Sequence, residues 1–154
     1  MQGNFVEDRV AYLLKEAQHA FRMAMDLALG ERGLTTPQYA VLNTLDTEPG
    51  LSNADLARRA FVTPQTMNSI VVLLEHAGFV ERRPHATHGR VLSTVLTPAG
   101  TELVQSCHEV VGRIEEQMLA PLSDAERAQL AMLLRTCATA LRTDTRPRRR
   151  REGR

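Results

Sequence analysis

The chain has 154 residues, a hydrophobic content of 43%, two cysteines and a formal net charge of +1 at pH 7. This length fits one domain, or one small domain with added helices, and two cysteines exclude a disulfide framework. No apolar run approaches the roughly 20 residues that span a bilayer, and the N-terminus lacks the apolar centre of a signal peptide, so we expect a cytoplasmic protein.

The first predicted element is a long amphipathic helix over residues 5–30. Its sequence contains no proline and no glycine before Gly30, and apolar residues recur at helical spacing along its whole length. At 1.5 Å per residue such a helix is about 35 Å long, which is more than a small domain needs for itself. Gly30 and Gly33 end it. A second helix then starts at Leu34-Thr35-Thr36-Pro37 and ends before Pro49-Gly50.

The segment from Leu51 to Gly78 is typical of two helices joined by a tight turn. Ser52 is expected to cap the first helix, Thr63 to cap the second, and Gly78 to end it. Along the second helix, apolar residues at helical spacing predict a buried stripe of Met67, Ile70, Val71 and Leu74. The opposite surface carries four short uncharged donors and acceptors, which are Gln65, Thr66, Asn68 and Ser69. Such side chains read base edges in a major groove, although a solvated helical hairpin is the alternative.

Two β-type segments follow, at residues 79–83 and 91–96, with polar turn-forming residues between them. They predict a β-hairpin with a long, basic-edged tip. A helix-turn-helix followed directly by such a hairpin is a winged helix, and the hairpin is its wing. We therefore expect a winged helix-turn-helix domain over residues 34–97.

Two further amphipathic helices complete the predicted fold. Thr97-Pro98 starts the first, Pro121 ends it, and Ser123-Asp124-Ala125-Glu126 forms a capping box for the second. The expected fold class is therefore mainly α with a small β-wing. Because the winged helix can close its own core, the apolar stripes of residues 5–30 and 98–142 need another surface. A symmetric dimer supplies that surface, and the alternative is a monomer whose terminal helices wrap the winged helix.

An arginine-rich tail, residues 143–154, ends the chain. It contains six arginines and two acidic residues, so the rest of the chain carries a net charge of −3. The tail has no apolar periodicity and is expected to be exposed. It would either add sequence-independent contacts to phosphates or serve only as a solubilising end.

Three segments occur in a distinctive order: LTTPQYAVLNTL (34–45), LSNADLARRAFVTPQTMNSIVVLLEHAGFVERR (51–83) and GRVLSTVLTPAG (89–100). Together they resemble the MarR family of winged-helix transcriptional regulators. The resemblance implies a homodimer with entwined terminal helices that binds a pseudo-palindromic operator in double-stranded DNA. It also implies a cleft for a small aromatic or phenolic effector, which commonly relieves repression.

The same resemblance implies roles for particular residues at a DNA interface. The polar face of the second helix-turn-helix helix would contact bases, and helix-start hydroxyls would face phosphates. Arg90 matches the family's wing arginine, which enters the minor groove. The family usually has an acidic residue two positions earlier, where this chain has His88, so the bracing of Arg90 differs. The candidate DNA-binding residues are Thr36, Ser52, Thr63, Gln65, Thr66, Asn68, Ser69, Arg82, Arg83 and Arg90. For Arg82 and Arg83, solvated strand-edge charges are the alternative.

For the effector cleft, the resemblance points to His19, Arg22, Met25 and Tyr39. A histidine, an arginine and a tyrosine near one another would hold an aromatic carboxylate. The alternative is that these residues belong to the dimer interface or the surface.

Other chemistries have weaker support in the sequence. Cys107 and Cys137 lie on apolar stripes, so we expect buried packing, with a thiol-based redox-responsive regulator of the same fold as the alternative. His85 and His88, with His108, make a weak zinc pattern, and neither a metal nor a cofactor is expected. No constellation for catalysis is present, so an enzyme is not expected. A winged helix used for protein–protein contact is a further alternative, but its polar helix face lacks an apolar anchor.

Overall fold

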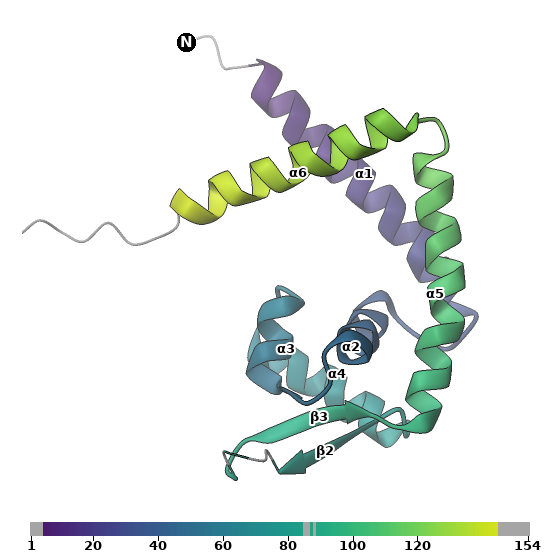
Figure 1. Cartoon of the computed structure of the whole chain (residues 1–154), viewed down its shortest axis with the longest axis vertical. Coiled ribbons are helices and arrows are strands. Elements are labelled where there is room, and N and C mark those ends of the chain that lie inside the picture. Colours follow the sequence, from purple (N-terminus) through teal and green to yellow (C-terminus); the bar gives the residue numbers. More distant parts are fainter. Residues whose placement is uncertain (1–4, 85–86, 88, 145–154) are drawn as a thin grey trace, which may run out of the picture. The chain divides into compact units, whose positions relative to one another are not determined.

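A computed structural model describes residues 5–84, 87 and 89–144, and it confirms a mainly α fold with a small β-wing (Figure 1). In chain order the elements are α1 (Phe5–Gly30), α2 (Thr36–Thr47), β1 (Leu51–Ser52), α3 (Asn53–Arg59), α4 (Pro64–His76), β2 (Val80–Pro84), β3 (Leu92–Leu96), α5 (Pro98–Leu119) and α6 (Asp124–Asp144). The chain divides into two compact units, Met1–Glu115 and Glu116–Arg154. Within the described part, none of the helices has the length and apolarity needed to cross a bilayer.

The core of the first unit lies among α2, α3 and α4, which occupy one side of the β2–β3 hairpin (Figure 1). Of the stripe predicted for α4, Met67, Val71 and Leu74 are buried and Ile70 is partly buried. Leu42 and Leu45 of α2 and Leu56 of α3 are 0–1% exposed and complete this core. The core also takes in Met25 and Leu29 from α1 and two residues of α5. The winged helix therefore completes its core with the adjoining parts of α1 and α5, beyond residues 34–97.

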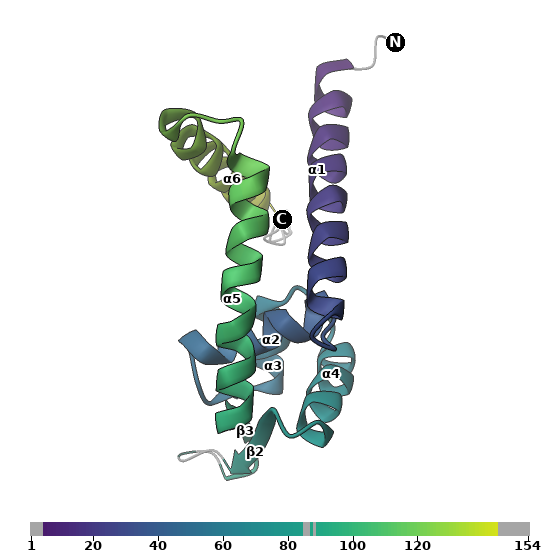
Figure 2. The same cartoon turned by 90° about the vertical axis from the view of Figure 1, so that its right-hand side faces the viewer.

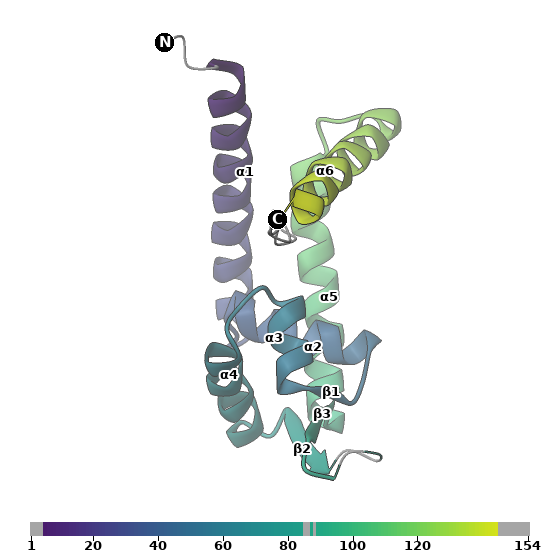
Figure 3. The same ribbon diagram turned by 90° about the vertical axis from the view of Figure 1, so that its left-hand side faces the viewer.

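The wing belongs to a three-stranded antiparallel sheet with the order β1-β3-β2 (Figure 3). The predicted hairpin is present, and Arg82 lies opposite Thr94 in its register. The third strand, β1, was not predicted; it pairs Leu51 with Thr94 and Ser52 with Ser93. Ser52 thus ends a strand and caps a helix at once, so the start of α3 is attached to the wing.

The starts of α3 and α4 have the predicted caps, and the structure adds the cap of α2. The hydroxyl of Ser52 accepts from the Asp55 amide at 3.2 Å, and that of Thr63 accepts from the Thr66 amide at 3.1 Å. For α2, Thr35 is the N-cap and forms a full capping box with Gln38. Thr36 is instead the first helical residue, because only the extended backbone of Thr35 turns a side-chain oxygen back toward the free amides.

The start of α5 is packed tightly against the residues that lead into β2. The hydroxyl of Thr97 donates to the carbonyl of Gly78 at 2.6 Å and accepts from the Gly100 amide at 3.1 Å. A Cβ atom at position 100 would lie 1.9 Å from the carbonyl oxygen of Phe79. Glycine is therefore required at position 100 by close approach of the backbones.

Helix α1 extends well beyond the winged helix, and only its C-terminal end reaches α2 and α4 (Figure 2). Side chains from Arg9 to Ala20 are all exposed, whereas Met25 and Leu29 are buried. The exposed part includes large apolar residues that follow the predicted stripe, namely Val10, Leu13 and Leu14. The long apolar stripe of α1 is thus buried only at its C-terminal end within its own unit.

The second unit consists of the end of α5 and helix α6. Ser123 and Glu126 form the predicted capping box, with the Ser123 amide 2.8 Å from a Glu126 carboxylate oxygen. Arg127 forms an ion pair with Glu116 at 2.9 Å. The apolar stripe of α6, predicted to face inward, is exposed along its length; it includes Leu130, Leu133, Leu134 and Leu141. Helix α6 runs two residues into the segment assigned to the tail, and residues 145–154 lie outside the described residues.

Candidate nucleic-acid interface

Helix α4 presents a polar surface to solvent opposite its buried stripe. Met67, Val71 and Leu74 are buried, so the side chains on the other side of the helix point away from the core. The four predicted base-reading residues, Gln65, Thr66, Asn68 and Ser69, are all exposed. They fall within the first two turns of the helix, the part that enters a major groove in helix-turn-helix proteins.

The hydroxyls at the helix starts are already engaged within the chain. Thr63 donates to the Thr66 hydroxyl at 2.9 Å while it caps α4, and Ser52 donates to a carboxylate oxygen of Asp55 at 2.6 Å. The Thr36 hydroxyl donates to Asp26 on α1 at 2.5 Å. These three predicted phosphate contacts therefore differ: Ser52 and Thr63 lie at starts of helix-turn-helix helices, whereas Thr36 is held against α1.

The three wing arginines have different environments. Arg90 is exposed at the end of the wing, and Arg83 is exposed and paired with Glu81. Arg82 is only 27% exposed, and its Nη2 lies 2.6 Å from Oε2 of Glu75 on α4. Arg82 is therefore a link between the wing and α4, and its role as a free phosphate ligand is correspondingly reduced.

The ion pair between Arg82 and Glu75 alters the ionisation of the carboxyl group. The hydrogen bond from the Arg82 side chain is the main reason that the pKa of Glu75 lies below its ordinary value. Glu75 is thus charged at neutral pH and holds the guanidinium on the α4 side of the wing.

A groove lies between the start of α3, α4 and the wing. It encloses about 570 Å³, and its lining includes Asn53, Asn68, Arg82 and Arg90. The Nδ2 of Asn53 donates to the carbonyl of Pro64 at 2.9 Å, which ties α3 to the start of α4. The Oδ1 of Asn53 is buried and has no hydrogen-bond partner among the described residues. The groove thus places two guanidinium groups and two asparagine side chains beside the exposed face of α4.

Comparison with known proteins agrees with this geometry. A MarR family profile matches residues 32–91. The HTH-type transcriptional repressor Rv2887 of Mycobacterium tuberculosis is 37% identical over 125 residues, which cover 81% of this chain and 90% of the repressor. The chain belongs to the MarR family. The resemblance inferred from the sequence is therefore confirmed.

Solved structures of MarR-family proteins share the fold. The Rv2887 structure in complex with DNA has a TM-score of 0.69 and 35% identity, and the match covers 82% of this chain and 95% of that chain. The Rv2887 structure in complex with salicylic acid has a TM-score of 0.67 and 36% identity, with 82% and 94% covered. The PcaV regulator from Streptomyces coelicolor has a TM-score of 0.70 and 28% identity, with 86% and 97% covered.

A pocket of about 290 Å³ lies between α1, α2 and the helix-turn-helix of this MarR-family chain. Its lining is mostly apolar and consists of Gln18, Phe21, Arg22, Thr36, Pro37, Ala40, Ala60, Val62 and Ile70. Arg22 is the one predicted ligand residue in this lining. Met25 is 4% and Tyr39 8% exposed in the core, and His19 is exposed elsewhere on α1. The structure therefore does not gather the four predicted ligand residues around this pocket.

Asp26 organises the polar rim of this pocket. Its carboxylate lies 3.6 Å from Nε of Arg22 and accepts the hydrogen bond from Thr36. That hydrogen bond is the main reason that the pKa of Asp26 is lowered. Asp26 was not predicted as a site residue. Its spacing of four residues from Arg22 on one helix was the available signal.

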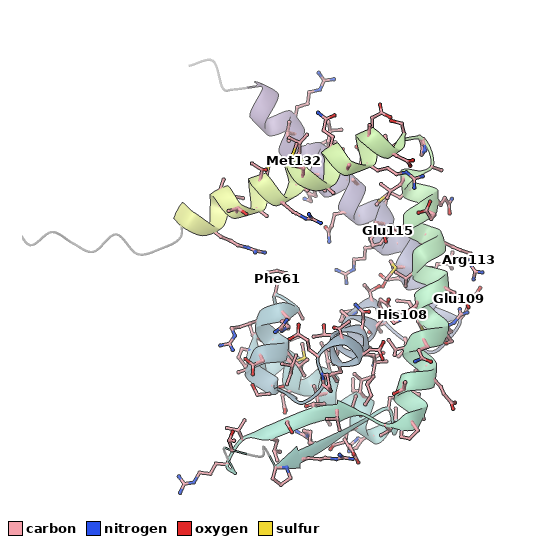
Figure 4. The ribbon with its side chains drawn as sticks, viewed as in Figure 1. Phe61, His108, Glu109, Arg113, Glu115 and Met132 are labelled. Carbon is pink, nitrogen blue, oxygen red and sulfur yellow. The ribbon has the colours of Figure 1, made fainter. Side chains whose placement is uncertain are left out.

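Tyr39 has a structural environment between α2 and α5. Its ring makes an edge contact with the ring of His108, with 6.2 Å between the ring centroids, and Nε2 of His108 is 3.0 Å from Oδ1 of Asn43. His108 is labelled on α5 in Figure 4. Burial raises the pKa of the Tyr39 hydroxyl. The tyrosine and histidine thus help to pack α5 against α2.

The cysteines occupy contrasting sites. Cys107 is 0% exposed, as predicted, and burial raises the pKa of its thiol, which disfavours the reactive thiolate. Cys137 is exposed on α6, so its predicted burial is not seen within the single chain. No metal-binding cluster occurs among the described residues. His85 and His88 lie outside them, so the zinc pattern and the altered bracing of Arg90 stay predictions.

Proposed function

We propose that this chain is a homodimeric, sequence-specific DNA-binding repressor that acts in the cytoplasm and has a regulatory, not a catalytic, role. The observation that carries the proposal is the exposed polar face of α4, presented between a capped α3 and the wing. A relative with 37% identity is named a transcriptional repressor, and its structure in complex with DNA shares the fold. A protein-contact module would need an apolar anchor on this face, and Gln65, Asn68 and Ser69 provide none.

The dimer is supported by the apolar surface that the single chain leaves exposed. Large apolar side chains are exposed along α6 and the first half of α1, including Val10, Leu13, Leu14, Leu133 and Leu134. An isologous interface between two copies would bury both stripes at once. Two copies would also place two α4 helices about one turn of DNA apart, which a palindromic operator requires.

At each half-site, we infer three kinds of contact. Gln65, Thr66, Asn68 and Ser69 would contact base edges in the major groove. The helix starts at Ser52 and Thr63 would face phosphates through their free amides, and Arg83 and Arg90 would follow the backbone and minor groove. Thr36 is the least suited of the proposed residues to contact a phosphate, because its hydroxyl already donates a hydrogen bond to Asp26 on α1.

Selection of bound DNA from a random pool tests the proposal. We expect a two-fold-symmetric site with half-sites about 10 base pairs apart. The variant Gln65→Ala should bind this site roughly tenfold more weakly, since one lost base contact costs about 1–3 kcal/mol. The control Gln105→Ala, an exposed glutamine on α5, should bind like the wild type. Equal affinity for scrambled DNA at physiological salt would refute sequence-specific binding.

We further propose that a small aromatic carboxylate, of the salicylate type, enters the pocket between α1, α2 and the helix-turn-helix. The related Rv2887 has been solved in complex with salicylic acid. The apolar lining would cover the ring of the ligand. Arg22 and the Thr36 hydroxyl, which now interact with Asp26, would bind the carboxylate of the ligand instead. Ala60 and Val62 line the pocket at the turn before α4, so an occupant would act directly on the position of the recognition helix.

Salicylate titration during a DNA-binding assay tests this second proposal. Millimolar salicylate should weaken operator binding by the wild type. The variant Arg22→Met should bind the operator normally without salicylate and lose the response, because a carboxylate there would lack its cationic partner. Arg113→Met, an exposed arginine of α5 that does not line the pocket, is the matched control (Figure 4). A full response by Arg22→Met would contradict the proposed site.

A further inference from the structure

The side chain of Asn68 has a fixed neighbour on the wing. The Nη1 of Arg82 donates to the Oδ1 of Asn68 at 3.4 Å, and both residues line the groove between α3, α4 and the wing. Asn68 itself is exposed on the polar face of α4. One of the proposed base-reading side chains, Asn68, is therefore already hydrogen-bonded to a residue of the wing.

The position of Arg82 is set by Glu75 and not by Asn68. Oε2 of Glu75 accepts from Nε of Arg82 at 3.0 Å and from Nη2 at 2.6 Å. Oε1 of Glu75 also lies 3.4 Å from the backbone amide of Arg82. With side-chain exposures of 27% and 31%, this pair is more shielded than the other wing pair, in which Arg83 is 65% exposed. The guanidinium is therefore held in place with its Nη1 directed at Asn68.

A guanidinium has five N–H donors and no acceptor, so only the oxygen of the Asn68 amide can face it. This settles which way the amide is turned. Its oxygen is turned toward Arg82, which uses one of its two lone pairs, and its NH₂ group, with two donors, stays fully available for DNA.

The four bases differ in what they offer to such a group. Asparagine normally recognises adenine with both atoms, accepting from N6 and donating to N7. Guanine presents two adjacent acceptors, N7 and O6, and cytosine presents a donor in the major groove. An amide that presents its NH₂ group is matched best by guanine, which offers two acceptors, and less well by thymine, whose O4 is a single acceptor. The adenine N6 and cytosine N4 donors are mismatched to it.

We propose that Arg82 is a positioning residue that turns the Asn68 oxygen toward the wing and presents its NH₂ group to DNA, so that Asn68 selects a G·C pair in each half-site. This inference rests on the proposed function, since it concerns the same face of α4. It assigns to the Glu75–Arg82 ion pair a part in base specificity, in addition to attachment of the wing.

The first experiment identifies the base pair that Asn68 reads. DNA is selected from a random pool by the wild type and by Asn68→Ala, and one position per half-site should lose its preference in the variant. We expect that position to be G·C in the wild-type site. Replacing its guanine with 7-deazaguanine should weaken wild-type binding several-fold, because an acceptor is lost, and should leave Asn68→Ala unaffected. An A·T pair at that position, or an unchanged preference in Asn68→Ala, overturns the inference.

The second experiment tests the positioning role. Arg82→Lys keeps a charge beside Glu75 but lacks the planar fork that reaches both partners. The freed Asn68 amide should then tolerate adenine, so the roughly tenfold preference for G·C over A·T should fall to about twofold. Arg59→Lys is the matched control, because Arg59 forms an ion pair with Glu48 and is not among the proposed DNA contacts, and its preference should equal that of the wild type. A strict G·C preference in folded Arg82→Lys refutes the positioning role.

Two further results separate the possible failures. If Arg82→Lys proves unfolded by circular dichroism, Arg82→Gln is used for the same comparison, with the same expected loss of G·C preference. If the wild type selects no sequence at all, the proposed function itself fails. If it selects a symmetric site with A·T at the position read by Asn68, only this inference fails.

Discussion

The winged-helix core of the first unit and helix α6 of the second unit differ in how far their leucines are exposed. In the first unit, Leu42 and Leu74 are 0% exposed, whereas Leu133 and Leu141 on α6 are 49% and 73% exposed. Burial of a leucine stabilises a fold by about 2 kcal/mol, so a helix that leaves a row of them in water is stable only when another surface covers it. The contrast teaches that the winged-helix core closes within one chain, while α6, like the first half of α1, leaves apolar surface for the proposed second copy.

The strongest test of this contrast is a charge placed in the α6 stripe. Leu133→Asp should convert the protein to a monomer, and operator affinity should fall on the order of 100-fold or more, because two linked half-site contacts become one. Light scattering and a DNA-binding titration measure the two effects. Ala128→Asp, about half a turn away around α6, should leave both unchanged. A dimeric Leu133→Asp would refute the role assigned to the stripe.

A second test compares two neighbouring leucines of α4. Leu74→Ala should lower the free energy of unfolding by about 3 kcal/mol, because it leaves a cavity in a closed core. Leu73, which is 57% exposed, is the matched control, and Leu73→Ala should cost less than about 0.5 kcal/mol. Urea denaturation gives both values. Similar losses for the two variants would mean that the core is not closed as described.

A third test uses the same capping chemistry in both units. Thr63→Ala removes the cap of α4 and should destabilise the first unit by about 1 kcal/mol, whereas Thr63→Ser should be nearly neutral. Ser123→Ala removes the cap of α6. If α6 is completed by a second copy, this change should raise the dimer dissociation constant about fivefold, which sedimentation measures. A dissociation constant equal to that of the wild type would speak against α6 as a dimer element.

The smallest expected effect concerns the pH dependence of the wing attachment. The pKa of Glu75 is lowered by Arg82, so the ion pair stabilises the fold above the ordinary glutamate pKa of about 4.3 and is lost as the pH falls through the lower folded value. Glu75→Gln should therefore be less stable than the wild type by under about 1 kcal/mol at pH 7, since the pair is partly exposed.

The same difference should shrink below about pH 4 as Glu75 becomes protonated. Urea denaturation of both proteins at several pH values measures it. A difference that persisted unchanged below pH 3 would show that charge on Glu75 is not its source.

Much of the fold could be predicted because its signals are local. Caps, prolines and apolar periodicity marked the helix-turn-helix. Thr63, Met67 and Gly78 could be assigned because each signal depends only on neighbouring residues in the sequence. The strand β1 was missed because two residues are too short to show a period of two. The cap of α2 was not assigned to one residue, because two threonines adjoin and only the backbone conformation distinguishes them.

The candidate site was less predictable wherever partners come from different elements. The exposure of Gln65 and Asn68 follows from helical periodicity, but the pairing of Arg82 with Glu75 depends on how the wing packs against α4. Likewise, His19 and Tyr39 were grouped with Arg22 because the family resemblance places effector contacts on their helices, although Tyr39 is buried near α5. Sequence spacing gives the face of a helix, and tertiary packing decides what that face meets.

The contact between Gly100 and Phe79 leaves no room for even one methyl group between the first turn of α5 and the chain entering β2. With Thr97 bonded to Gly78 as well, the two segments cannot slide past each other. A tilt of the first turn of α5 would therefore also move the residues at the base of the wing. In the proposed dimer, the angle of α5 would therefore influence where each wing lies on the operator.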